Sequence, residues 1–156
     1  SELTSNAYIK ATSIAFSAVT SNNLMWLSEG GLFRDCSFED IELEGTLEVD
    51  ILRFVDSKMI DTHISIYGGG YRVFGSEFIE STLFSESLGL TAHVLESSFE
   101  GTSYNVAITD LSDVTLYIRD SSIENYNIGV VKDGGELRMK CTSISECDLA
   151  VKAEPY

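Results

Sequence analysis

The sequence predicts an all-β solenoid, in which short parallel strands stack in about seven rungs of 19–24 residues each. Three observations lead to this fold. Apolar residues recur in three columns at that period, a small residue keeps the same place in every repeat, and apolar and polar residues alternate within each segment. The period indicates stacked rungs, and the alternation indicates that the rungs are built from strands rather than helices.

The three apolar columns are found by aligning the repeats on a central anchor residue. The anchors are Ile14, Phe38, Met59, Phe78, Phe99, Ile123 and Ile144. Five residues before each anchor stand Ile9, Phe33, Phe54, Val73, Val94, Ile118 and Met139. Five residues after each anchor stand Val19, Leu43, Ile64, Leu83, Tyr104, Ile128 and Leu149. Since only 44% of the chain is hydrophobic, columns made entirely of such residues predict the inward side of each rung.

A column of small residues lies two residues before the anchors. Its members are Thr12, Cys36, Ser57, Ser76, Ser97, Ser121 and Thr142. One size class at a fixed repeat position indicates that equivalent residues stack directly on one another. With both corners of the rung at constant length, we expect the variable loops after the third strand, at 20–31, 45–50, 67–70, 84–91, 107–113 and 131–136.

The strongest copies of the repeat are "IRDSSIENYNIGV" (118–130) and "MKCTSISECDLAV" (139–151). An apolar strand, a polar corner, an anchor and an "IGV"-like strand follow one another in "LYIRDSSIENYNIGV" (116–130). In this phrase the chain resembles the right-handed parallel β-helix superfamily with the pectate-lyase-like fold, over residues 7–151. The resemblance implies a right-handed single-stranded parallel β-helix, and it does not imply one particular activity.

Composition limits the partners and the domain organisation. The formal net charge of −15 argues against nucleic acid and against anionic membranes, and no apolar run is long enough for a transmembrane helix. The three cysteines are too few for a disulfide framework and are expected to be buried thiols. We expect residues 1–156 to be one domain and a segment of a larger protein, because neither end shows a capping helix.

Basic residues concentrate on the outward positions of the first strand in each rung. They are Arg34, Arg53, Arg72, Arg119, Arg138 and Lys140, with His93 in the same set. One interpretation is a ladder of ion pairs with the neighbouring corner acids; the other is a binding face for an anionic glycan or an acidic partner. Beside the basic residues, Val55, Phe74 and Leu95 predict an exposed apolar stripe, a candidate interface with another domain or a second copy.

The resemblance implies where a catalytic site would lie. In the polysaccharide lyases and hydrolases of that superfamily, the active site is on the outward face of the third strand, and it is formed by clustered Asp or by calcium-binding acids. Here the only candidates are Glu42 and Glu44 on one strand and His63 on the next, a weak set for acid–base chemistry. No cofactor is expected. Calcium would suit an acidic ridge at the second corner, although no calcium-binding motif is present; the ridge is Glu39, Asp40, Asp61, Glu80, Glu100, Glu124 and Glu146.

The sequence favours a non-catalytic scaffold, or an adhesin-like surface module that contacts glycans, in an extracellular or cell-surface location. Two alternatives stay open. One is a segment of a polysaccharide-active enzyme, a lyase or hydrolase, with its site at Glu42, Glu44 and His63. The other is a self-assembly module that associates through its ends or through the Val55–Phe74–Leu95 stripe.

Overall fold

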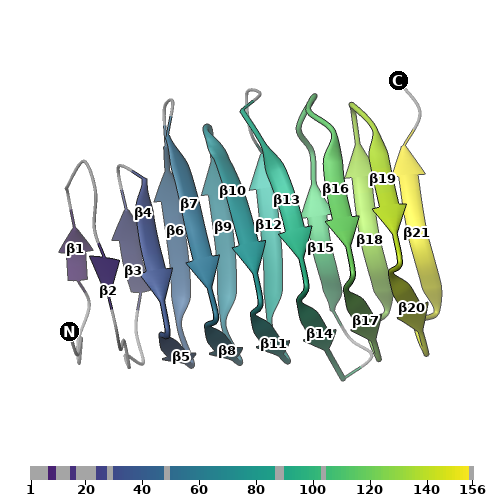
Figure 1. Cartoon of the computed structure of the whole chain (residues 1–156), viewed down its shortest axis with the longest axis horizontal. Coiled ribbons are helices and arrows are strands. Elements are labelled where there is room, and N and C mark those ends of the chain that lie inside the picture. The colour runs from purple at the N-terminus through teal and green to yellow at the C-terminus, as the bar shows by residue number, and fades with distance from the viewer. Residues whose placement is uncertain are drawn as a thin grey trace.

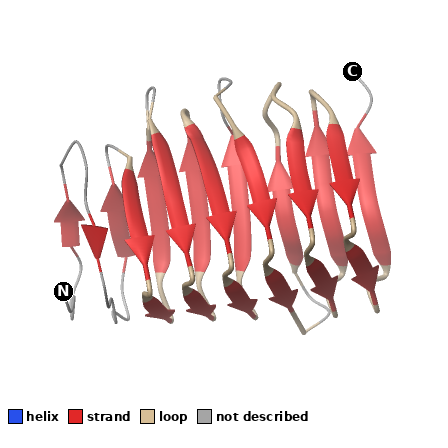
Figure 2. Ribbon diagram, in the orientation of Figure 1, coloured by secondary structure: helices blue, strands red, loops and turns tan. Residues whose placement is uncertain are grey.

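The computed structural model is a parallel β-solenoid, in which the chain winds through three sheets that run side by side along one axis (Figure 1). The structure describes residues 7–9, 15–16, 24–27, 30–47, 50–86, 90–102 and 105–154. Within these ranges every regular element is a strand, and no helix occurs (Figure 2). The predicted all-β solenoid is therefore confirmed.

Each sheet collects one strand from every coil. Sheet A consists of β1 (Ala7–Ile9), β3 (Leu24–Leu27), β6 (Glu42–Thr46), β9 (His63–Tyr67), β12 (Thr82–Glu86), β15 (Val106–Asp110), β18 (Ile128–Asp133) and β21 (Leu149–Glu154). Sheet B consists of β2 (Ala15–Phe16), β4 (Gly31–Arg34), β7 (Ile51–Val55), β10 (Gly70–Phe74), β13 (Ala92–Leu95), β16 (Leu116–Arg119) and β19 (Leu137–Lys140). Sheet C consists of β5 (Ser37–Glu39), β8 (Lys58–Ile60), β11 (Glu77–Ile79), β14 (Ser98–Glu100), β17 (Ser122–Glu124) and β20 (Ser143–Ser145).

The coils follow the order sheet B, sheet C, sheet A, and six of them are complete in the described part of the chain, rather than the seven expected. The first expected rung is wrong in register. Phe16, not Ile9, is the partner of Phe33 in sheet B, while Ile9 pairs with Leu27 in sheet A. Several apolar residues lie close together here, so the apolar pattern alone does not decide which of them belongs to sheet B. Thr12, Ile14 and Val19 lie outside the described residues.

Two of the predicted columns are confirmed from the second rung onward. In sheet C the anchors from Phe38 to Ile144 are register partners in consecutive strands. In sheet B the column from Phe33 to Met139 is continuous in the same way. The corner between these sheets has two residues in every coil, as expected, because the strand ends on both sides stay in register.

The third column is correct only as far as Leu83, whose partner in the next coil is Ile108. Ile108 in turn pairs with Val130, and Val130 with Val151, so the expected members Ile128 and Leu149 stand two residues before the observed column. Tyr104 lies outside the described residues. The corner between sheets C and A causes the shift, since it has two residues in the first three coils, five in the fourth and three in the last two.

Tyr126 explains how the wide fourth corner is packed. Its buried hydroxyl donates a hydrogen bond of 2.8 Å to the carbonyl oxygen of Ser81, two coils earlier. Gly101 makes room for this ring, because a Cβ atom at Gly101 would lie 2.8 Å from the nearest ring atoms. The first residue of the longer corner therefore lies against a buried aromatic ring. The loops after sheet A are shorter than expected, as β15 extends to Asp110 and β18 to Asp133.

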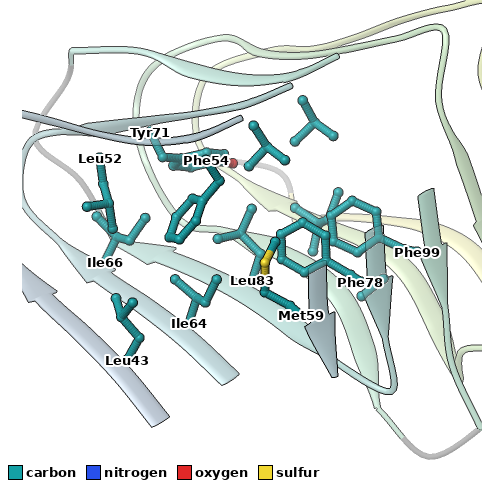
Figure 3. Packing of buried hydrophobic residues seen from close by; sticks show 14 of the residues in the cluster. Leu43, Leu52, Phe54, Met59, Ile64, Ile66, Tyr71, Phe78, Leu83 and Phe99 are labelled. Atoms are coloured by element: carbon teal, nitrogen blue, oxygen red, sulfur yellow. The ribbon is translucent and has the colours of Figure 1, made fainter. Parts of the chain in front are cut away.

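The core is a continuous column of apolar side chains between the three sheets (Figure 3). Phe33 stacks on Phe54 with ring centroids 5.4 Å apart, and Phe78 stacks on Phe99 at 4.2 Å. These stacks follow directly from the strand register, because equivalent side chains of adjacent parallel strands lie one above the other. Of the three cysteines expected to be buried, only Cys36 is; Cys147 is half-buried and Cys141 is exposed at the first corner.

A ladder of hydroxyl groups joins the coils at the corner between sheets B and C. The backbone N–H groups of Cys36, Ser57, Ser76 and Ser97 each donate to the Oγ of the serine in the next coil, at 3.1–3.2 Å. Each serine hydroxyl then donates to the carbonyl oxygen two residues earlier in its own coil. The predicted column of small residues is therefore a column of buried hydrogen-bonding groups. Each serine hydroxyl accepts from the previous coil and donates within its own.

The residue before each ladder member has a left-handed backbone conformation. The φ angles of Asp35, Asp56, Gly75, Glu96, Asp120 and Cys141 lie between 49° and 59°. This conformation turns the chain from sheet B into sheet C within two residues. Gly75 in this series is the residue type with the least steric cost at such a position.

A buried ion pair lies inside the solenoid, near the C-terminal ends of the sheet A strands β15 and β18. The Lys132 ammonium contacts Asp110 Oδ1 at 3.1 Å, and both side chains are almost fully buried. The Tyr71 hydroxyl donates to Asp110 Oδ2 at 2.9 Å, while the carbonyl oxygens of Ser112 and Asp133 accept the other Lys132 hydrogen bonds. Burial, and then the charge of Asp110, raise the pKa of Tyr71 well above its ordinary value. This cluster was not predicted from the sequence.

We expect Ser97→Ala to lower the free energy of unfolding by about 1–3 kcal/mol, because the Ser76 N–H and the Leu95 carbonyl each lose a buried partner. Urea denaturation followed by circular dichroism measures the change. The control is Ser37→Ala in β5, an exposed position where we expect a change within about 0.5 kcal/mol. Equal effects of the two substitutions would contradict a stabilising role for the ladder.

We expect Lys132→Met to cost about 3–5 kcal/mol, because it leaves the Asp110 carboxylate buried without its counter-charge. The triple variant Tyr71→Phe/Asp110→Leu/Lys132→Met removes both charges and the Tyr71 hydroxyl, leaves only Ser112 and backbone groups of the cluster, and should recover part of that loss. The same denaturation experiment compares the two, with the exposed Lys152→Met as control. A triple variant no more stable than Lys132→Met would show that the cluster is not an isolated polar unit.

Candidate functional site

The outer face of sheet B gathers all six basic residues singled out in the sequence. Outward side chains form two columns along the solenoid axis. The first column is Leu32, Arg53, Arg72, His93, Tyr117 and Arg138. The second column is Arg34, Val55, Phe74, Leu95, Arg119 and Lys140. Register therefore places the predicted cations and the predicted apolar stripe on the same surface, one strand spacing apart from coil to coil.

Few of these cations are neutralised. In the described part of the chain, ion pairs on this face join Arg119 to Asp120 at 3.1 Å and Arg138 to Glu136 at 2.7 Å. The four salt bridges between described residues include none made by Arg34, Arg53, Arg72 or Lys140. Among the corner acids Asp35, Asp56, Glu96 and Asp120, only Asp120 pairs with a base of this face. The predicted ion-pair ladder is thus formed at one position.

Arg53 and Arg72 are the most informative pair. They are register partners in neighbouring strands, so two positive charges stand side by side without an acidic partner among the described residues. Like charges at this separation repel each other, and an anion bound between them would relieve the repulsion. A protein with 25 acidic residues could have placed a carboxylate here and has not. This arrangement favours an external anion.

The apolar stripe is continuous beside these arginines. Val55, Phe74 and Leu95 are consecutive partners in β7, β10 and β13. Phe74 is 39% exposed, while Val55 and Leu95 are half-buried. The face therefore combines an apolar strip with cations along its side and at both of its ends, at Arg34 and at Arg119.

A groove runs between the two columns over β13, β16 and β19. It is lined by outward residues of both columns and by the two residues between them: His93, Leu95, Tyr117, Ile118, Arg119, Arg138, Met139 and Lys140. The rings of His93 and Tyr117 meet edge to face at 5.2 Å, and the Arg138 guanidinium lies 5.7 Å from the Tyr117 ring centroid. Burial, and then the positive charge of Arg72, lower the pKa of His93. Tyr117 occupies the same repeat position as Arg53 and Arg72, but it was not among the candidate residues predicted from the sequence.

The candidate catalytic residues lie on the outer face of sheet A. Glu42 is the register partner of His63, and Glu44 is the partner of Ser65. The His63 Nδ1 atom forms a hydrogen bond of 2.8 Å with the Thr82 hydroxyl. No hydrogen bond or ion pair between described residues joins His63 to either glutamate. These three residues share a face without forming an acid–base relay, and their catalytic role stays a prediction.

The acidic ridge has a backbone explanation. Asp40, Asp61, Glu80 and Glu146 adopt left-handed φ angles of 46–53° at the corner between sheets C and A. Among the described residues, no group of three His, Cys, Asp or Glu side chains is arranged to hold a metal ion. Four of the seven ridge acids therefore occupy turn positions, while Glu39, Glu100 and Glu124 end strands of sheet C.

Comparison with protein-family models, curated proteins and solved structures finds no match to this chain. Within the described residues, no helix has the length and apolar character needed to cross a membrane.

Proposed function

We propose that this chain is a non-catalytic β-solenoid module of a secreted or cell-surface protein, and that the outer face of sheet B contacts acidic glycans. The unpaired Arg53–Arg72 couple beside the Val55–Phe74–Leu95 stripe carries this proposal. Sugar rings present apolar C–H faces together with polar edges, and a uronate adds one carboxylate per ring. A surface with an apolar strip bordered by cations complements both features.

The shape of the face supports a linear ligand. Its cations and apolar groups recur at the strand spacing of about 4.8 Å, so an extended chain lying along the axis meets equivalent groups at regular intervals. The strands of this face are paired on both sides from β4 to β16, so their edges are closed to an added peptide strand. These points favour a polysaccharide over an acidic peptide.

The resemblance to the right-handed β-helix superfamily, which includes proteins that act on polysaccharides, is consistent with this proposal. No described contact favours catalysis at Glu42, Glu44 and His63. Self-association through the same face is the competing possibility, because an acidic surface of a second copy would also complement it. The experiment below separates the three.

We expect polygalacturonate to bind the intact chain in isothermal titration calorimetry, more weakly as salt concentration rises, and a neutral glucan not to bind. The double variant Arg53→Ala/Arg72→Ala should weaken binding about tenfold, since two partly exposed charge contacts contribute about 0.5–1 kcal/mol each. Lys58→Ala/Lys152→Ala is the matched control, because it removes the same charge from sheets C and A and should change affinity less than about twofold.

Three results would contradict the proposal. An equal loss of affinity in both double variants would show that binding depends on the net charge of the protein alone. Release of reducing ends from polygalacturonate, abolished by Glu42→Ala, would establish the enzyme instead. A concentration-dependent rise in sedimentation mass that Arg53→Ala/Arg72→Ala removes, without any glycan binding, would identify the face as a contact between copies.

A further inference from the structure

We propose that the groove over β13, β16 and β19 is the subsite of this face that holds a single carboxylated sugar residue, with Leu95 and Tyr117 as its apolar walls and Arg119, Arg138 and Lys140 around the carboxylate. This inference rests on the proposed function and makes it specific. It distinguishes one recess from the neighbouring surface around Arg53 and Arg72.

The walls of the groove are held in place before any ligand arrives. Tyr117 stands between His93 on one side and the Arg138 guanidinium on the other, and Arg138 Nη1 donates to the Tyr117 hydroxyl at 3.4 Å. Arg138 is itself fixed by Glu136, which accepts a hydrogen bond of 2.8 Å from Nε. A ring that is 38% exposed and held on both sides loses little freedom when a ligand packs against it.

The charges suit one carboxylate. Lys140 makes none of the salt bridges formed between described residues, so its ammonium is available to an anion. Arg119 and Arg138 are oriented by Asp120 and Glu136 through exposed ion pairs, which contribute little energy and leave other guanidinium N–H groups available. Lys140 is the partner of Arg119 in the next strand, and Tyr117 is the partner of Arg138. Three cations and an aromatic edge therefore converge on one recess.

His93 makes the groove sensitive to pH. The charged and titratable groups around it are Arg72 from β10 and Tyr117 from β16, with Arg138 from β19 beyond the tyrosine ring. No carboxylate pairs with it among the described residues. Burial and the charge of Arg72 lower the pKa of His93, so the imidazole is neutral near pH 7.

An anion bound in the groove counteracts the lowering of the pKa of His93. Negative charge beside His93 favours the imidazolium, so the pKa of His93 is higher in the complex than in the free protein. Linkage then requires the ligand to bind more tightly to the protonated form. The added affinity is present at pH values below the pKa of the free protein and is lost as pH rises through the pKa of the complex. Affinity should therefore increase on acidification from pH 7.5 to pH 5.5.

The chain contains two histidines, which lie on different sheets and report on different faces. His93 borders the groove on sheet B, whereas His63 borders the candidate catalytic residues on sheet A. An NMR titration of the imidazole resonances against pH, with and without saturating trigalacturonate, measures both pKa values in one sample. Maltotriose is the neutral control ligand.

We expect trigalacturonate to raise the pKa of His93 by about half a unit to one unit and to leave that of His63 unchanged, with a rise in affinity of about three- to tenfold between pH 7.5 and pH 5.5. Lys140→Ala and Tyr117→Ala should each weaken binding several-fold. His93→Gln should abolish the pH dependence. Lys152→Ala in β21 is the charge control.

Failure of the groove proposal and failure of the proposed function would give different results. Binding that Arg53→Ala/Arg72→Ala weakens, while Lys140→Ala and the pKa of His93 show no effect, would overturn the groove and leave the proposed face standing. A shift at His63 instead of His93 would move binding to sheet A and overturn both. Absence of any binding by trigalacturonate and polygalacturonate would remove the proposed function and the subsite with it.

Discussion

The rest of the structure depends on the hydrogen-bonded stacking of one coil on the next at the corner between sheets B and C. Strand ladders alone would allow neighbouring coils to slip by two residues, since such a shift preserves the inward and outward sides. The serine ladder prevents slippage, because each buried hydroxyl must meet one particular N–H of the previous coil and one carbonyl of its own. A slipped coil would leave these groups buried without partners, at a cost comparable to the net stability contributed by several apolar contacts.

At the corner between sheets C and A, the equivalent bonding joins Thr62 to Ser81, and the corner keeps two residues up to that coil. It widens in the fourth coil, where Gly101 lies against the ring of Tyr126, whose hydroxyl donates to the Ser81 carbonyl two coils away. The strands of sheet A then run on in a new register and bring Asp110 opposite Lys132 in the interior. The two opposite charges lie buried beside each other, with hydrogen bonds from Tyr71 and to Ser112, so each compensates part of the cost of burying the other.

The same stacking determines the chemistry of the outer surface. A residue that points outward in one coil is repeated along the axis by its equivalents, so a preference for arginine at one repeat position becomes a row of cations. In a chain of net charge −15, this row stands out electrostatically from its surroundings. The apolar stripe from Val55 to Leu95 arises in the same way, two residues further along each strand. The proposed contact with an acidic glycan uses both rows, and their spacing is that of the backbone itself.

The sequence by itself determined the fold class, the period and two of the three core columns, because apolar alternation and a small-residue column depend only on local pattern. It also placed Arg53, Arg72 and Phe74 on one face, since outward positions follow from inward ones. The presence of Gly75 in a series otherwise occupied by Asp35, Asp56, Glu96, Asp120 and Cys141 was a signal of the left-handed corner that could have been used.

Only the tertiary structure decided the pairing of Ile108 with Leu83, the start of the first coil and the burial of Asp110 against Lys132. A register shift by an even number of residues leaves the inward side of a strand unchanged, so the hydrophobic pattern cannot detect the shifts in sheet A. Side-chain contacts across coils depend on those shifts. In sheet B the register is regular and Tyr117 has the repeat position of His93 and Arg138, whereas the contacts among these three side chains appear only in the structure.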